Sequence, residues 1–236
     1  MKCIRLFHSA PRATGKPLVL AAGIALFALL FALLFTATYV RAASVAAAST
    51  QPVPAPDDEQ DSAAELLGEP ARAWSFERWV DSPPLTLESL RGKVVLVRWF
   101  NTNCRFCGNT LPGLETLRTR YAAQGLVVVG VFHPKPVHKV SDAFVRRTAR
   151  KLGFNGPIAV DEEWTTLNRW WLANHPGRNW TSVSFLIDRD GVVRWAQGGG
   201  EYHPSGDPRH ASCDASYAEL ERTIRRLTGT SSADAH

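Results

Sequence analysis

The stretch Val94–Pro112 reads VVLVRWFNTNCRFCGNTLP and places two cysteines between two different periodic patterns. The continuous apolar run before the cysteines is typical of a buried strand, and the apolar spacing from Leu111 to Tyr121 after them predicts an amphipathic helix. The stretch therefore predicts a strand, a loop and a helix, with Cys104 and Cys107 at the start of the helix.

Cys104 and Cys107 are three residues apart, so on a helix they lie on one face and can close a small disulfide ring. The partial positive charge and free N–H groups of a helix N-terminus favour a thiolate at Cys104, and Arg105 adds a cation. The pattern suits thiol–disulfide exchange, in which Cys104 attacks and Cys107 resolves the mixed disulfide. Half of a zinc site and a structural bridge are the alternatives. A zinc site normally needs a second C-x-x-C or a close His pair, and Cys3 and Cys213 lie in no such motif, so no metal is expected at the pair.

The N-terminal part of the chain predicts a membrane anchor. Residues 18–40 carry no charge, and as a helix these 23 residues reach about 35 Å, enough for a bilayer core of about 30 Å. Residues 1–17 are basic and contain no acid, so by the positive-inside bias they are cytoplasmic and the rest is extracytoplasmic, on the periplasmic side. A cleaved signal peptide is the alternative, although the run is long for one. Both interpretations put the remainder in a disulfide-permissive compartment.

Composition divides the remainder of the chain. Residues 41–70 are rich in Ala, Pro, Ser and acids and predict a disordered linker, residues 71–228 predict the redox domain, and residues 229–236 predict a disordered tail. The chain has a net charge of +5, of which residues 71–236, with 22 bases and 16 acids, carry +6. This mild excess without interleaved aromatic residues gives no reason to expect nucleic-acid binding.

The order of patterns predicts the fold class. Strands are expected at 74–79, 94–100, 126–132, 157–160, 183–187 and 192–195, and helices at 104–123, 140–152, 162–173 and 214–228. This order predicts an α/β fold of three layers, a central mixed sheet with helices on both faces. The C-x-x-C loop then lies at the carboxyl end of a central strand, where open α/β sheets place their sites.

Several motifs together resemble a known family. They are LRGKVVLV, Trp99, CRFC, Pro112 and the run GLVVVGV within residues 90–131, followed by FLIDRDG at 185–191. They resemble the thioredoxin fold, and within it the membrane-anchored, extracytoplasmic TlpA-like reductases and related redoxin domains. The resemblance implies Cys104 as the exposed nucleophile, Cys107 as the buried resolving thiol and no cofactor beyond their redox-active disulfide. It also implies protein thiols and disulfides as substrates and a membrane thiol reductant or oxidant as partner. Pro112 matches the family's kink in the redox helix.

Two residues depart from that pattern. Ser182 stands where the family usually has a cis-proline, and because a non-proline cis bond costs about 3 kcal/mol, we expect a trans bond or a local rearrangement. With serine in place of this proline, metal and peroxide chemistry stay open as alternatives. Arg98 stands where thioredoxin-like proteins often carry a buried acid. An inward cation would favour the thiolates and make the pair more oxidising than that of thioredoxin. The alternative is that Arg98 snorkels or pairs with a carboxylate.

Three functions remain open at this point: a thiol–disulfide oxidoreductase, a redoxin-type thiol peroxidase, and a copper-handling protein that uses Cys104, Cys107 and a histidine such as His133. An apparent insertion at residues 203–216 adds a further pattern, because His210-x-x-Cys213 could ligate a metal or supply a third redox thiol. A loop with one unpaired cysteine is the alternative.

Overall fold

The computed structural model describes residues 63–173 and 175–229, and these residues hold one six-stranded mixed sheet. Its strands, in spatial order, are β1 (Arg78–Val80), β4 (Ile158–Val160), β3 (Leu126–Phe132), β2 (Val94–Phe100), β5 (Ser184–Ile187) and β6 (Val193–Gln197). β2, β3 and β4 run parallel to one another, whereas β1, β5 and β6 are each antiparallel to a neighbour. The predicted mixed sheet is confirmed, and β2 lies inside it.

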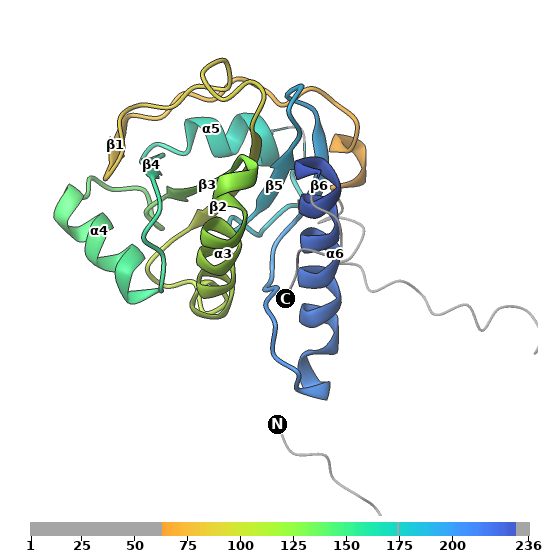
Figure 1. Cartoon of the computed structure of the whole chain (residues 1–236). Helices are drawn as coiled ribbons and strands as arrows, with labels where there is room; N and C mark the ends of the chain where they lie inside the picture. The colour runs from red at the N-terminus through yellow and green to blue at the C-terminus, as the bar shows by residue number, and fades with distance from the viewer. Residues whose placement is uncertain (1–62, 174, 230–236) are drawn as a thin grey trace, which may run out of the picture. The chain divides into compact units, whose positions relative to one another are not determined.

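Helices cover both faces of the sheet, as predicted. One layer holds α3 (Cys107–Tyr121), α4 (Asp142–Lys151) and α6 (Ala211–Thr228), and Figure 1 shows α3 and α6 in front of the strands. The other layer holds the short α5 (Thr165–Leu167), the π-helical turn η3 (Asn168–Leu172) and the 3-10 turn η1 (Ala64–Leu66). Two further 3-10 turns, η2 (Ala122–Gln124) and η4 (Pro208–His210), follow α3 and precede α6.

The alternation of β2 divides the interior into two apolar clusters. Leu96 and Phe100 belong to the cluster beneath α3 and α6, whereas Val97 and Trp99 belong to the cluster on the opposite face. All seven residues of β2 are buried, which explains why the strand is a nearly continuous apolar run. By the same alternation, Arg98 points into the α3 side of the sheet, where it is the one charged residue of the strand.

The predicted first strand is longer than the observed one. β1 holds only Arg78–Val80, because Trp74 and Phe76 turn into the second cluster instead of pairing with a strand. The Trp74 ring stacks on Trp170 with centroids 6.1 Å apart, and its Nε1–H donates to the carbonyl of Leu85 at 2.9 Å. Burial of large aromatic surface here outweighs the strand hydrogen bonds that these residues give up.

The expected boundary of the redox domain at residue 71 is too late. Residues 63–70, assigned to the disordered linker, are ordered, and the side chains of Ala63 and Leu66 are buried. The Gly68 N–H donates to the Val193 carbonyl at 2.9 Å, and the Val193 N–H donates to the Glu69 carbonyl at 2.9 Å. This segment therefore extends the β6 edge of the sheet.

Three helix boundaries also differ from the predictions. α3 begins at Cys107 and not at Cys104, and α6 begins at Ala211, before the expected 214. The helix expected at 162–173 is divided into α5 and η3. It starts late because the Asp161 carboxylate accepts hydrogen bonds from the N–H groups of Thr166 and Leu167, which fixes the first turn there.

The predicted segments 1–17 and 18–40, most of the predicted linker and nearly all of the predicted tail lie outside the described residues. None of the helices within residues 63–173 and 175–229 combines the length and the apolar character needed to cross a bilayer.

Candidate active site

The two cysteines form a disulfide at the carboxyl end of β2. Their Cα atoms are 5.4 Å apart, and the Cys107 N–H donates to the Cys104 carbonyl at 3.1 Å. Cys107 is the first residue of α3 and is fully buried, whereas Cys104 precedes the helix and is half-buried. The disulfide thus joins the two cysteines that the sequence singled out, and the helix begins one turn later than expected. An incoming thiolate can reach the Cys104 sulfur and cannot reach the Cys107 sulfur.

Ser182 lies directly against the disulfide. Its Oγ is 3.1 Å from the Cys104 sulfur and 3.7 Å from the Cys107 sulfur. Since neither sulfur of a disulfide carries a proton, the hydroxyl can only be the donor in these contacts. The one cis peptide bond among the described residues precedes Pro136, so the bond before Ser182 is trans, one of the two expected outcomes. The residue that replaces the cis-proline thus offers a hydrogen-bond donor to both sulfurs.

A cleft of about 450 Å³ opens beside Cys104. Trp180 and Phe106 form its apolar wall, with ring centroids 5.4 Å apart, and Trp180 is 40% exposed. Arg105 and Lys135 place two cations on its rim. Gly199 supports the wall from behind: at its φ of 141° a Cβ would lie 2.6 Å from the Trp180 ring, so this position requires glycine.

His133 is buried beneath this cleft and contacts two residues that line it, Asn101 and Thr181. Its Nε2 lies 2.9 Å from Thr181 Oγ1 and 3.4 Å from Asn101 Nδ2. The Asn103 N–H donates to Asn101 Oδ1, which orients the amide so that its nitrogen donates to the ring. His133 is therefore neutral, with its Nε2 as acceptor. Burial, reinforced by the charge of Lys135, lowers the pKa of His133 to about 3.

Arg98 is fully buried and points inward. Its guanidinium donates to Ser184 Oγ at 3.2 Å and to the Gly200 carbonyl at 3.1 Å, and it lies over the Tyr202 ring at 5.4 Å. Within the part of the chain that the structure describes, it neither snorkels nor pairs with a carboxylate, so the alternative interpretation is wrong. Burial lowers the pKa of Arg98, although an arginine stays charged.

Arg98 and the disulfide contact two serines at and just before the start of β5. Ser184, the first residue of β5, contacts the guanidinium, and Ser182, two residues earlier in the chain, contacts both sulfurs. Tyr202 completes this buried polar group: its hydroxyl lies 2.6 Å from Ser184 Oγ, and its N–H donates to Thr110 Oγ1 on α3. The structure thus brings Arg98 to the buried side of the redox pair.

The two remaining predicted residues are Arg105 and Pro112. Arg105 is exposed, with its guanidinium 4.6 Å from the Phe106 ring centroid. Pro112 lies inside α3 five residues after Cys107, where its ring nitrogen leaves the Gly108 carbonyl without a helical donor.

His133 does not join the two cysteines in a ligand group. Within the described residues, the one group of three or more His, Cys, Asp and Glu side chains spaced to hold a metal lies elsewhere, between Glu201 and Cys213. The copper hypothesis therefore gains no preformed site at the redox pair.

Sequence reasoning missed Asn101, Thr181, Trp180 and Tyr202. The first three could have been found from topology: they lie at the end of β2 and directly before β5, and these two strands are neighbours. The contact of Tyr202 with Ser184 could not be found from topology, because it depends on the path of the loop after β6.

These features define a thioredoxin-fold protein with a redox-active C-x-x-C pair. Residues 67–196 match the model of the AhpC/TSA family, and the chain belongs to that family. The expected resemblance to thioredoxin-fold redoxin domains is thereby confirmed.

Individual relatives agree with this assignment. The chain is 34% identical over 129 residues to the protein DipZ of Mycobacterium tuberculosis, covering 53% of this chain and 18% of DipZ. It is 30% identical over 108 residues to the thiol-disulfide oxidoreductase ResA of Geobacillus kaustophilus, covering 46% of this chain and 56% of that protein. The matched regions thus span less than two thirds of these relatives.

Solved structures agree on the fold. A thiol-disulfide isomerase of Corynebacterium glutamicum superposes with a TM-score of 0.50 and 22% identity, covering 67% of this chain and 96% of that one. A thioredoxin-like superfamily protein superposes with a TM-score of 0.50 and 20% identity, covering 69% of this chain and 97% of that one.

Proposed function

We propose that this protein is a thiol–disulfide oxidoreductase that exchanges electrons with protein dithiols and disulfides. One observation carries the proposal: the Cys104–Cys107 disulfide presents one reachable sulfur at a cleft and keeps the other buried. The names of relatives such as ResA support the same chemistry.

The proposed reaction moves two electrons in two exchange steps. The Cys104 thiolate attacks one sulfur of a substrate disulfide, and the other substrate sulfur leaves as a thiolate that takes up a proton. The Cys107 thiol then loses its proton and attacks the Cys104 sulfur, which releases the second substrate thiolate and leaves the Cys104–Cys107 disulfide. The same steps run backwards when the protein oxidises a dithiol.

Ser182 is proposed to stabilise the Cys104 thiolate. A hydrogen bond to a charged group contributes about 1.5–3 kcal/mol, so we expect Ser182→Ala to raise the pKa of the Cys104 thiol by about one to two units. The pH dependence of alkylation of the reduced protein measures that pKa. Thr102→Ala, which removes an exposed hydroxyl from the same loop, is the control. An unchanged pKa in Ser182→Ala would remove this role.

Arg98 is proposed to stabilise the reduced pair. At an effective dielectric constant of about 20, a cation about 8 Å from a thiolate favours it by about 2 kcal/mol. We therefore expect Arg98→Met, which keeps the length and removes the charge, to lower the reduction potential by about 40 mV. Equilibration with glutathione buffers measures the potential, and Arg98→Lys should retain most of the wild-type value. A folded Arg98→Met protein with the wild-type potential would contradict this role.

The cleft is proposed to receive an extended protein segment that carries the substrate cysteine. Its exposed Trp180 suits an apolar neighbour of that cysteine, and Arg105 and Lys135 suit acidic ones. We expect Trp180→Ala to raise the KM for a protein disulfide about tenfold and to leave the reduction of a small aromatic disulfide unchanged. Leu67→Ala, at an exposed apolar residue outside the cleft, is the control. Equal effects on both substrates would argue against a peptide-binding cleft.

The site is proposed to act outside the cytoplasm, held by residues 18–40 as a membrane anchor and served by a membrane thiol reductant or oxidant. The uncharged run and the basic residues before it support this placement. Resistance of the full-length chain to alkaline extraction from membranes, together with protease access from the periplasmic side, tests it. Release by alkali would contradict the anchor.

One comparison of substrates tests the proposed activity. The reduced protein is mixed separately with insulin, hydrogen peroxide and copper(I), and the loss of protein thiols is followed. We expect one insulin disulfide to be reduced for each Cys104–Cys107 pair oxidised. Peroxide consumption faster than insulin reduction would select the thiol peroxidase, and stoichiometric copper(I) binding without insulin reduction would select the copper-handling protein.

A further inference from the structure

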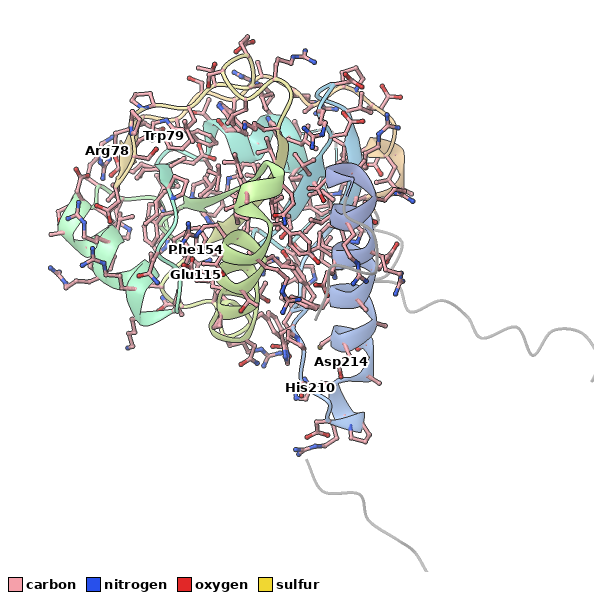
Figure 2. The ribbon with its side chains drawn as sticks, in the orientation of Figure 1. Arg78, Trp79, Glu115, Phe154, His210 and Asp214 are labelled. Atoms are coloured by element: carbon pink, nitrogen blue, oxygen red, sulfur yellow. A yellow bond between two sulfur atoms is a disulfide. The ribbon has the colours of Figure 1, made fainter. Side chains whose placement is uncertain are left out.

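A second cluster of chemically active side chains lies at the start of α6. Glu201 and His203 lie on the loop after β6, His210 ends η4, and Cys213 occupies the first turn of α6. Figure 2 shows His210 at the N-terminal end of that helix. One potential ligand atom from each of the four residues lies within 4.8 Å of the others. Cys213 is a free thiol and takes no part in the redox pair.

The spacing of these atoms fits a tetrahedral ion. His203 Nε2 lies 3.7 Å from Glu201 Oε2, His210 Nδ1 lies 3.6 Å from Glu201 Oε1, and Cys213 Sγ lies 3.7 Å from His210 Nδ1. Tetrahedral zinc with bonds of about 2.0–2.3 Å separates its ligand atoms by about 3.3–3.7 Å. The His210–Cys213 pair matches this separation, and each histidine lies at it from one of the two Glu201 oxygens, so a small rotation of the carboxylate brings one oxygen to both. The two nitrogen–oxygen pairs are longer than an ordinary hydrogen bond between such atoms.

One polar atom of the cluster is left without a hydrogen-bond partner. His203 Nε2 is buried and has no hydrogen-bond partner, which is costly for an imidazole nitrogen. The side chain of Glu201 is 16% exposed and that of His203 is 12% exposed. The neighbouring carboxylate of Asp214 does not compete, because it accepts hydrogen bonds from the N–H groups of Ser205 and Gly206.

A hydrogen bond from the redox helix orients the carboxylate. Asn109 Nδ2, on α3, donates to Glu201 Oε2 at 2.7 Å. An amide donor of this kind behind a carboxylate ligand is a common feature of metal sites, because it fixes the oxygen that binds.

We propose that Glu201, His203, His210 and Cys213 bind one Zn²⁺ ion. One thiolate, two imidazoles and one carboxylate form a donor set that suits zinc and does not suit magnesium or calcium, which prefer oxygen ligands. Four protein ligands fill the tetrahedron, so the site is structural. Binding displaces the Cys213 thiol proton and ties the loop after β6 to α6 and, through Asn109, to α3.

A background in which Cys213 is the sole thiol isolates this site from the redox pair. The full-length chain with Cys3→Ser, Cys104→Ser and Cys107→Ser meets this need, since the sequence has four cysteines. Cobalt(II) is the probe. We expect one equivalent to bind with a thiolate-to-cobalt charge-transfer band and the intense visible bands of a tetrahedral ion, and Zn²⁺ to displace it.

Single substitutions in that background assign the ligands. Cys213→Ser should abolish the charge-transfer band, and His203→Ala and His210→Ala should each weaken cobalt binding more than tenfold. His138→Ala, at an exposed histidine outside the cluster, should change nothing. Zn²⁺ should raise the Tm of the background protein and leave that of its Cys213→Ser derivative unchanged, which also shows whether each variant is folded.

Two results would overturn the zinc site: a folded background protein without the charge-transfer band, or equal cobalt affinity before and after Cys213→Ser. Because the background lacks both redox cysteines, neither result bears on the proposed oxidoreductase. Conversely, failure of insulin reduction by the wild-type protein would leave the zinc site standing.

Discussion

A Cys107→Ser protein is expected to accumulate as a covalent complex with its partners. Cys104 is reachable and can still attack a disulfide, but the buried sulfur that would release the product is gone. The mixed disulfide then persists, because the serine hydroxyl is too weak a nucleophile to attack a disulfide. Non-reducing electrophoresis of cell extracts should show higher-mass bands that collapse on reduction.

A Cys104→Ser protein is the matched comparison. It keeps the other sulfur of the pair, yet that sulfur is fully buried. We expect its exchange with protein disulfides to fall by at least about a thousandfold and no partner bands to form. Equal trapping by the two variants would show that both sulfurs are reachable, and the division of roles between Cys104 and Cys107 would then be lost.

The positions of Cys104 and Cys107 could be predicted from the sequence because they depend on the local order of strand, loop and helix. A buried strand, a loop and a helix fix where Cys104 and Cys107 lie, and the same periodic patterns gave the mixed sheet with helices on both faces. The start of α3 was misplaced because no side chain caps it: Phe106 precedes it without a capping hydrogen bond, so the usual sequence signal is missing.

The surroundings of the pair depend on contacts between distant segments and could be predicted only in part. An inward Arg98 was one of two interpretations of its place in a buried strand, but its partners Ser184 and Gly200 lie 86 and 102 residues away in the sequence. Of the proposed zinc ligands, the sequence indicated two, in the pattern His210-x-x-Cys213. Glu201 and His203 joined it only in the structure, because the loop after β6 folds back on α6.

The stability of the protein is expected to fall by about 2 kcal/mol between pH 6.5 and pH 5 through His133 alone. The pKa of this buried imidazole is lowered from 6.5 to about 3, so in this window the folded protein keeps it neutral and the unfolded chain protonates it. The unfolded state therefore binds more protons, and the rise of stability with pH steepens toward about 1.4 kcal/mol per unit at the acidic end of this window. Protonation would also replace the acceptor at Nε2 with a donor facing the amide nitrogen of Asn101.

Denaturant unfolding of wild-type and His133→Gln proteins at pH 6.5 and pH 5 measures this effect. The glutamine side chain cannot take up a proton, so the variant should lose about 2 kcal/mol less than the wild type between the two pH values, whatever its stability at pH 6.5. Carboxylates such as Glu115 and Asp188 interfere little, because their lowered pKa values put their loss of stability below pH 5. His138→Gln, at an exposed histidine, should behave as the wild type. If wild type and His133→Gln lost the same free energy of unfolding between the two pH values, His133 would have to be protonated in the folded protein. It could then not be the neutral acceptor between Asn101 and Thr181.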